Sequence, residues 1–479
     1  FHDSLVSFAE RRVIYMNSES RKKIQFPHSY VIIICVLLFA CIMTYVIPAG
    51  EYARYENSAG LTVVDPDTFK FVPNTPVALW RVPEQIMNSA AKNATVVFSI
   101  FIIGGAFGVI LATGAFEALT AKMAKRFAGK ETWLIPAFSL IFALATTTMA
   151  NNQFIGFAPI GVMVALAFGF DAVVGCGMIC LGGAIGFSTG TFNVNTTGIA
   201  QEIAELPLFS GLWLRCISFV IFLVVTDIYL ISYAKKIKAD PRKSVMYGLQ
   251  TNNTDEAKTI DDFQKMNKKH VIVLLTILAF FIVLIYGCAN YKWGLAKVSV
   301  VFMYMSVASG LLYGFGPSRI AKEYIKGMKD MTEPAIIIAM GCATTLILSE
   351  GHVLDTVVRS LAQGIGYLPY ILRAPGMYIL QTVTNFFIVA GNAQAAVAMP
   401  IMVPVADMVG VSRQTAVLAF NFGDGLSNYI LPHSSALMGF IGMANIPYDR
   451  WMRFMLKLFA IWAVVAMIIV AFASVIQYS

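Results

Sequence analysis

A single carboxylate with polar neighbours lies inside an otherwise apolar stretch of the chain. Asp424 belongs to the motif Phe422-Gly423-Asp424-Gly425. An ionisable group within a membrane segment is costly and is a functional candidate by default. It could bind a cation, carry a proton or pair with a substrate amine, and it could equally cap a helix end. The polar side chains that follow it and could act as ligands are Ser427, Asn428, His433 and Ser434.

The glycines on either side of Asp424 predict that its helix breaks at this motif. Free backbone groups at a break cannot face lipid, because each unsatisfied group carries a high free-energy cost. A break at this depth is therefore expected only where it lines a wet cavity enclosed by protein, as in secondary transporters. Free N–H groups at a half-helix N-terminus attract carboxylates, whereas carbonyl, hydroxyl and amide oxygens suit Na⁺. His433 could titrate near neutral pH or hydrogen-bond a carbonyl.

The same stretch occurs twice in the chain. Asn151-Asn152-Gln153 aligns with Asn392-Ala393-Gln394, and the register continues without a gap until Gly182 falls on Gly423. The matches include Asn, Gln, Pro and Gly, which favours a repeat over a chance likeness of two apolar helices. A polar patch follows each predicted break. The further candidate ligands are Asn151, Asn152, Gln153, Ser188, Thr189, Thr191, Asn193, Asn195, Asn392 and Gln394, with Na⁺ expected near Asn151, Thr191, Asn392 and Asp424. The same residue types also cap helix ends without binding a ligand.

Composition places the chain in a membrane. It has 479 residues, of which 58% are hydrophobic and 13% charged. That charged fraction is about half of the soluble norm. The net charge of +8 does not indicate nucleic-acid binding, because the basic residues lie in short loops, where they set the topology. No phosphate loop, zinc-protease or serine-hydrolase motif is present, so the sequence predicts a polytopic membrane protein that is not an enzyme.

The apolar segments predict an all-α fold with four parts. These are a cytoplasmic N-terminal lead (1–28), a first transmembrane repeat (29–233), a cytoplasmic linker (234–270) and a second repeat with one extra helix (271–479). The segments between the spans are treated as loops, with a small hairpin around 57–60. Residues 1–15 differ from the rest, so Met16 could be the natural start.

Loop charge predicts how the two repeats are oriented. Basic loops remain on the cytoplasmic side of a membrane. The loop containing Lys122 precedes the first apolar hairpin, which therefore enters from the cytoplasm. The sparsely charged segment after Gly351 precedes the second hairpin, which therefore enters from outside. The sequence thus predicts inverted repeats with two re-entrant hairpins and two broken helices, an architecture of alternating access.

The chain resembles a known family. Residues 392–438, together with the stretches IIGGAFGVILATGAFEALTAKM and PHSY…VIPAGEY, resemble YfcC-like proteins, which are grouped with the DcuC-type C4-dicarboxylate anaerobic carriers. The resemblance implies a fold like that of the ion transporter superfamily, often with an elevator mechanism and homodimers. It also implies dicarboxylates or basic amino acids as substrates. Several relatives carry Gly-x-Gly-Glu-Glu at the first hairpin tip, where this chain has Met149-Ala150-Asn151-Asn152-Gln153, and this departure weakens the basic amino acid alternative.

The leading hypothesis is an ion-coupled symporter or exchanger for a small carboxylate-bearing metabolite, a C4-dicarboxylate or an amino acid. An arginine/ornithine-type antiporter is the alternative, and a channel or an intramembrane enzyme using Asp424 and His433 is disfavoured. We expect no cofactor other than Na⁺ or H⁺ as the coupling ion. The expected partners are the substrate, the lipid bilayer of a bacterial inner membrane and a second copy of the chain, and no nucleic acid.

Overall fold

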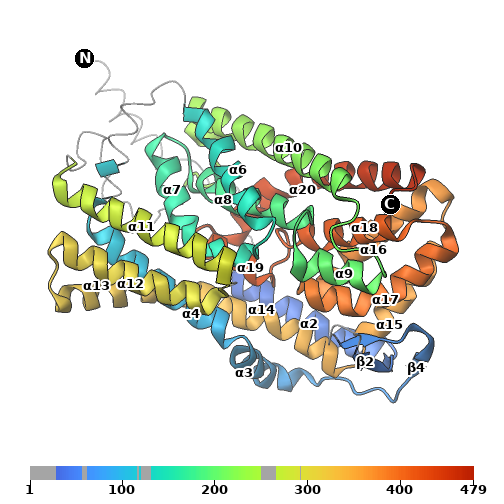
Figure 1. Ribbon diagram of the computed structural model, residues 1–479. Coiled ribbons are helices and arrows are strands. Elements are labelled where there is room, and N and C mark those ends of the chain that lie inside the picture. Colours follow the sequence, from blue (N-terminus) through green and yellow to red (C-terminus); the bar gives the residue numbers. More distant parts are fainter. Residues whose placement is uncertain (1–28, 57–61, 116–117, 120–130, 250–265, 292) are drawn as a thin grey trace, which may run out of the picture.

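The computed structural model describes residues 29–56, 62–115, 118–119, 131–249, 266–291 and 293–479 (Figure 1). The N-terminal lead, the loop containing Lys122 and most of the central linker lie outside these residues, so what the sequence predicts for them remains a prediction. The described chain is mostly helical, as the apolar segments predict (Figure 1).

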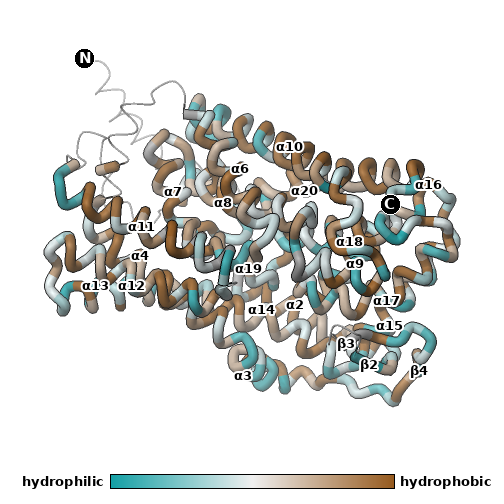
Figure 2. Tube along the Cα trace, viewed as in Figure 1, coloured by the Kyte–Doolittle hydropathy of each residue, from teal (hydrophilic) through white to brown (hydrophobic). Residues whose placement is uncertain are grey.

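Six helices of the described chain are long and apolar enough to cross a membrane, judged by length and composition. They are α4 (Ala94–Ala112), α10 (Leu212–Ala239), α12 (Leu295–Tyr313), α14 (Thr332–Glu350), α17 (Gly391–Val409) and α20 (Tyr448–Val475). The other main helices are α2 (Ser29–Val46), α6 (Leu134–Thr146), α7 (Ala158–Ala167), α8 (Ala172–Ser188), α9 (Ile199–Ile203), α11 (Lys268–Tyr291), α16 (Tyr370–Phe387), α18 (Arg413–Ser427) and α19 (Ser435–Met443). Figure 2 shows hydrophobic residues along outer helices such as α10.

The predicted small hairpin is confirmed. Strand β2 (Arg54–Glu56) pairs antiparallel with β3 (Thr62–Val64), and β1 (Gly50–Glu51) pairs with β4 (Lys70–Phe71). Asp355 holds this segment to the helical body, because its carboxylate accepts from the backbone N–H of Tyr52 at 3.0 Å and from the Arg54 guanidinium at 3.0 Å.

Three segments treated as loops are helices instead, which corrects the sequence-based picture. They are α3 (Val82–Lys92), α13 (Pro317–Asp330) and α15 (Leu354–Ile365). Each alternates polar and apolar residues with helical spacing, so a search for long apolar runs passes over it. α13 lies on α4 through glycines: a Cβ on Gly108 would come within 2.5 Å of the Glu323 carbonyl oxygen.

Two helices, α8 from the first half of the chain and α18 from the second, lie at the centre of the core. Nearly every residue of α8 and of α18 is buried. α6 and α7 pack against α8, α16 and α17 pack against α18, and α8 and α18 contact each other. α10 also packs on α8, and α20 packs on α18. The two apolar stretches that align in the sequence therefore lead into two helices, α8 and α18, which touch each other and have corresponding neighbours.

The predicted position of the second helix break is wrong. α18 continues through Gly423, Asp424 and Gly425 and ends at Ser427, and α8 ends at Ser188. The glycines serve close packing instead of a break. A Cβ on Gly423 would lie 2.5 Å from the Cβ of Gln381. Helical glycine is tolerated here because any larger residue would push the neighbouring helix away.

Candidate functional site

The C-terminal ends of α8 and α18 meet inside the protein. A Cβ on Gly425 would lie 2.5 Å from the Cα and Cβ atoms of Ser188, the last residue of α8. Ser188 is fully buried, and Ser427, the last residue of α18, is 1% exposed. The polar ends of the two aligned stretches are therefore brought together in one enclosed place.

Each of these helices approaches its neighbour in the same way. A Cβ on Gly182 would lie 2.6 Å from the backbone oxygen of Ser139 in α6. In the aligned position, a Cβ on Gly423 would lie 2.8 Å from the backbone nitrogen of Thr382 in α16. Because both obstacles include backbone atoms, neither position accommodates a side chain without moving a helix.

The start of α17 contacts Asp424. A Cβ on Gly391, the first residue of α17, would lie 2.5 Å from Oδ2 of Asp424 and 2.9 Å from Cγ2 of Thr196, which belongs to the first half of the chain. In the first half the arrangement is reversed. There Gly183, which aligns with Asp424, accommodates the side-chain amide of Asn151. In the first half, the side chain of Asn151 comes from the predicted hairpin tip and Gly183 from the helix. In the second half, Gly391 comes from the predicted hairpin tip and the side chain of Asp424 from the helix.

Asp424 is a buried carboxylate with unused bonding capacity. It is 1% exposed, and its Oδ1 has no hydrogen-bond partner. No Lys, Arg or His side chain forms an ion pair with it in the part of the chain that the structure describes. A buried carboxylate needs a proton, a cation or hydrogen-bond donors to offset its desolvation. Oδ1 of Asp424 therefore remains available to a hydrogen-bond donor or a cation.

An asparagine that the sequence analysis missed organises the groups around Asp424. The Nδ2 of Asn385, near the end of α16, donates to the Asp424 carbonyl at 2.9 Å, to Ser427 Oγ at 2.7 Å and to Asn428 Oδ1 at 3.1 Å. Its own Oδ1 is buried without a partner. No motif distinguishes Asn385 in the sequence. Its position in the arm that precedes the second tip was the only available signal.

Further oxygens are unpaired in this region of the fold. Asn151 Oδ1 and Thr191 Oγ1 are buried without hydrogen-bond partners. Ser188, Thr189 and Ser427 donate to carbonyls of their own helices at 2.6 to 2.8 Å, and Ser427 Oγ also accepts from Asn385. Hard cations prefer such carboxylate, amide and hydroxyl oxygens. The described residues contain no cluster of three His, Cys, Asp or Glu that could hold a metal.

Some of the remaining predicted residues are buried, and two of them bond to side chains of other elements. Asn151 donates to the hydroxyl of Tyr429 in the other half of the chain. Gln394 is buried and donates to Gln381. Asn193 is buried, and Asn195 lies in the π-helical turn Val194–Gly198, with its side chain outside the described atoms.

Five predicted residues are exposed, half-buried or hydrogen-bonded to the backbone of their surroundings. Asn392 is exposed and accepts from the backbone of Ala393. Gln153 donates to the carbonyl of Trp293, and its neighbour Asn152 is half-buried. Ser434 caps α19 by accepting from Leu437. His433 contacts the Phe386 carbonyl at 2.9 Å, so of its two open interpretations the structure supports the hydrogen bond.

Two further contacts join the halves and were not predicted. Thr197 donates to Oδ1 of Asn421 at 3.1 Å. Arg215 of α10 is fully buried and donates to Gln414 of α18 at 2.9 Å, while its Nε and Nη1 have no partner. Periodicity can show that these residues lie on helices, but it cannot show which helices meet.

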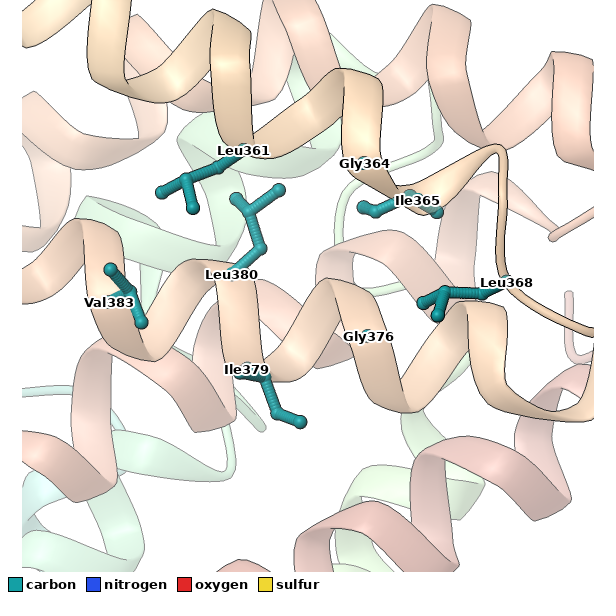
Figure 3. A pocket seen from close by; sticks show the side chains of 8 residues that line it. All are labelled: Leu361, Gly364, Ile365, Leu368, Gly376, Ile379, Leu380 and Val383. Atoms are coloured by element: carbon teal, nitrogen blue, oxygen red, sulfur yellow. The ribbon is translucent and has the colours of Figure 1, made fainter.

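A surface groove between α15 and α16 lies apart from Asp424 (Figure 3). Its lining consists only of aliphatic side chains and glycines: Leu361, Gly364, Ile365, Leu368, Gly376, Ile379, Leu380 and Val383. It offers no polar side chain to hold a carboxylate or a cation. The groove is therefore unsuited to the substrates and ions that the sequence predicts.

A family model and two relatives match nearly the whole chain. The family model of the C4-dicarboxylate anaerobic carriers, DcuC, matches residues 26–475. The chain is 26% identical to the Escherichia coli protein described as "Putative basic amino acid antiporter YfcC", covering 96% of this chain and 99% of that protein. It is 24% identical to an uncharacterized Haemophilus influenzae protein, covering 92% of this chain and 95% of that one.

Two solved transporter structures are distantly similar. The Alcanivorax borkumensis YdaH transporter has 14% identity and a TM-score of 0.41, with 93% of this chain and 98% of that chain covered. Neisseria gonorrhoeae MtrF has 12% identity and a TM-score of 0.40, with 95% and 96% covered. Scores this low carry no conclusion about this chain. The family match spans almost its whole length, and the protein therefore belongs to the C4-dicarboxylate anaerobic carrier (DcuC) family.

Proposed function

We propose that this protein is a secondary active transporter of a small carboxylate-bearing metabolite that works by alternating access. The observation that carries the proposal is the contact of Gly391 with both Asp424 and Thr196. It places the tip before α17, the end of α18 and the polar segment after α8 at one buried point. Carriers bind substrate and coupling ion where such discontinuous helices meet.

The transporter is built, in this proposal, from two inverted repeats. α6 and α7 form the first re-entrant hairpin around α8, and α16 and α17 form the second around α18. Support comes from the matched glycine contacts of Gly182 and Gly423 and from the gapless alignment of the two stretches. The charge pattern of the loops supports opposite orientations. The same proposal gives a homodimer in a bacterial plasma membrane, with the N-terminus in the cytoplasm.

Asp424 is the proposed coupling-ion site, with Asn385, Ser427 and Asn428 beside it. Na⁺ would use the unpaired oxygens of Asp424 and Asn385, and H⁺ would use the carboxylate alone. The substrate carboxylate would bind the amides and hydroxyls near Asn151 and Thr191. A C4-dicarboxylate is favoured by the family description. A basic amino acid exchanged by antiport is the alternative, supported by the description of the E. coli relative and by a buried carboxylate free to meet an amine.

Transport into proteoliposomes tests the proposal. The probes are labelled succinate, fumarate, aspartate, arginine and lysine, each with and without Na⁺ and a pH gradient. We expect saturable uptake and counterflow of at least one probe, and loss of ion-driven uptake in Asp424→Asn. Asp67→Asn removes an exposed carboxylate from the turn between β3 and β4 and is the matched control. Conversion of a probe without transport would support an enzyme, and non-saturable flux without counterflow would support a channel; either result overturns the proposal.

A further inference from the structure

A second carboxylate lies in the middle of a helix long and apolar enough to cross a membrane, and the sequence analysis did not single it out. Asp227 is in the middle of α10, the helix Leu212–Ala239. Val224 and Ile228, which flank it, are 49% and 60% exposed and face outward, where a membrane helix meets lipid. Asp227 itself is 8% exposed and lies on the inner side of the helix. Such a carboxylate is expensive and is a functional candidate by default.

The surroundings of Asp227 contain little that could stabilise its negative charge. The hydroxyl of Ser139 in α6 is near the carboxyl group, but neither this hydroxyl nor Oδ1 of Asp227 has a hydrogen-bond partner, and both atoms are buried. No Lys, Arg or His forms an ion pair with Asp227 among the described residues. An ionised carboxylate with a buried, unpaired oxygen in a low-dielectric site is strongly disfavoured.

The elements packed on α10 keep their charged groups away from this depth. α6 has no ionisable side chain, and α8 contributes only the thiols of Cys176 and Cys180. On α20 the charged residues are Asp449, Arg450, Arg453 and Lys457. All four precede Trp462 by more than a helical turn, and it is Trp462 that donates to Thr226 beside Asp227 at 2.9 Å.

Charged groups elsewhere on these elements lie near the ends of the helices. Glu131 precedes α6, and Arg242 and Lys243 follow α10. On α10 itself, Arg215 donates to Gln414, and the lysines Lys235, Lys236 and Lys238 lie in the last turns. Tyr229 and Tyr233 donate their hydroxyl groups to Phe454 and Asp171. A proton is thus the remaining means of neutralising Asp227.

Two paths of contact connect Asp227 with the candidate site. Ser139 lies near Asp227, and its backbone oxygen is so close to Gly182 of α8 that a Cβ on the glycine would come within 2.6 Å of it. On the other side, Trp462 contacts the ring of Tyr429 at 6.4 Å between centroids, and Tyr429 accepts from Asn151. Movement of α8 or of the segment around Asn151 would therefore change the environment of the Asp227 carboxyl.

We propose that Asp227 is a proton-binding site that is loaded and emptied during the transport cycle, an inference that rests on the proposed function. In the loaded state the carboxylic acid is neutral and faces Ser139. When the movement of α6 and α8 admits water, the O–H bond breaks, the proton passes to water and the carboxylate keeps the electron pair. Return of the helices requires a proton from the opposite side, because the charged form is disfavoured in the closed site.

Transport assays with isosteric variants test this role. The probe is whichever of succinate, aspartate or arginine shows counterflow in the wild type. Asp227→Asn keeps the shape and cannot release a proton, so we expect it to lose the stimulation of uptake by a pH gradient while still exchanging substrate for substrate. Asp227→Glu should regain a pH response, and Asp67→Asn should respond like the wild type. A normal pH response in Asp227→Asn, or loss of exchange in both Asp227 variants, would overturn the proposal.

An infrared measurement keeps this inference separate from the proposed function. Wild-type protein in lipid is shifted from acid to alkaline pH, and the carboxyl stretching band of a buried protonated acid is followed. We expect one such band to disappear in the wild type and to be absent in Asp227→Asn at every pH. An unchanged set of bands in the variant would refute proton binding at Asp227, even for a protein that transports. Wild-type protein that shows the Asp227 band and transports no probe would contradict the proposed function alone.

Discussion

Gly391 and Asp424 lie against each other, so that a Cβ on the glycine would come within 2.5 Å of Oδ2 of the carboxylate. Gly391 begins α17, and Asp424 lies in the last turn of α18. The glycine leaves room for a carboxylate that has no ion-pair partner among the described residues. The distance between the start of α17 and this carboxylate therefore decides how closely a cation or a proton at Asp424 is enclosed.

Gly391→Ala should impair transport while the fold persists. The added methyl group meets the carboxylate of Asp424 and Cγ2 of Thr196, so the start of α17 must move away from the site. The initial rate of counterflow in proteoliposomes measures the effect, with size-exclusion chromatography as the check on folding. Gly364→Ala in α15 is the matched control, because a Cβ there meets no atom within 4 Å. Equal rates for Gly391→Ala and wild type would show that the contact has no role in transport.

Gly425→Ala should destabilise the junction between the two halves. Its Cβ would meet the Cα and Cβ atoms of Ser188, and overpacking of a buried contact costs about 1–3 kcal/mol. We expect a lower Tm in detergent solution. Ser188→Gly removes the side-chain obstacle, so the double variant should regain part of the loss. A double variant whose loss equals the sum of the two single losses would mean that the residues do not act on each other.

Gln414→Leu should destabilise the packing between the N-terminal ends of α10 and α18. The change removes the acceptor of the buried Arg215 guanidinium, and an unsatisfied buried donor costs about 1–3 kcal/mol. The double change Arg215→Met and Gln414→Leu should recover stability, because it removes the buried charge together with its acceptor. Thermal unfolding measures both effects, with the exposed Gln363→Leu in α15 as the control. A Tm of Gln414→Leu equal to that of the wild type would contradict this account of Arg215.

The segment that carries strands β1 to β4 should lose stability at high pH because Tyr52 ionises there. Burial raises the pKa of Tyr52 from 10.0 to about 12, with nearby Asp355 adding to the rise and Arg359 opposing it. A group with a raised folded-state pKa contributes stability that is present below pH 10 and is lost as the pH rises through about 12. Tyrosine absorbance during alkaline titration follows the ionisation, and Tyr52→Phe should remove one late-titrating group. Loss of a group that titrates near pH 10 in Tyr52→Phe, with the late titration unchanged, would show that Tyr52 ionises in its ordinary range.

The sequence by itself determined the long apolar elements, and it predicted that two stretches of them are duplicated. Apolar runs marked helices such as α4, α10 and α14, and the alignment of Gly182 with Gly423 anticipated that two helices would be packed in the same way. Asp424 could be singled out because a charge within an apolar segment is costly wherever the segment lies. These conclusions depend on local composition and spacing, which the chain carries before it folds.

Only the tertiary structure decided which residues meet. Asn385, Thr197 and Arg215 are functional or structural candidates because their partners come from distant parts of the chain. The glycines around Asp424 were interpreted as helix breakers, yet α18 continues through them. Their role is to leave room for Gln381, which lies against Gly423, and for Ser188, which lies against Gly425. Glycine allows both a break and a close approach. The choice between the two depends on the neighbouring helix, and no local pattern in the sequence records which helix that is.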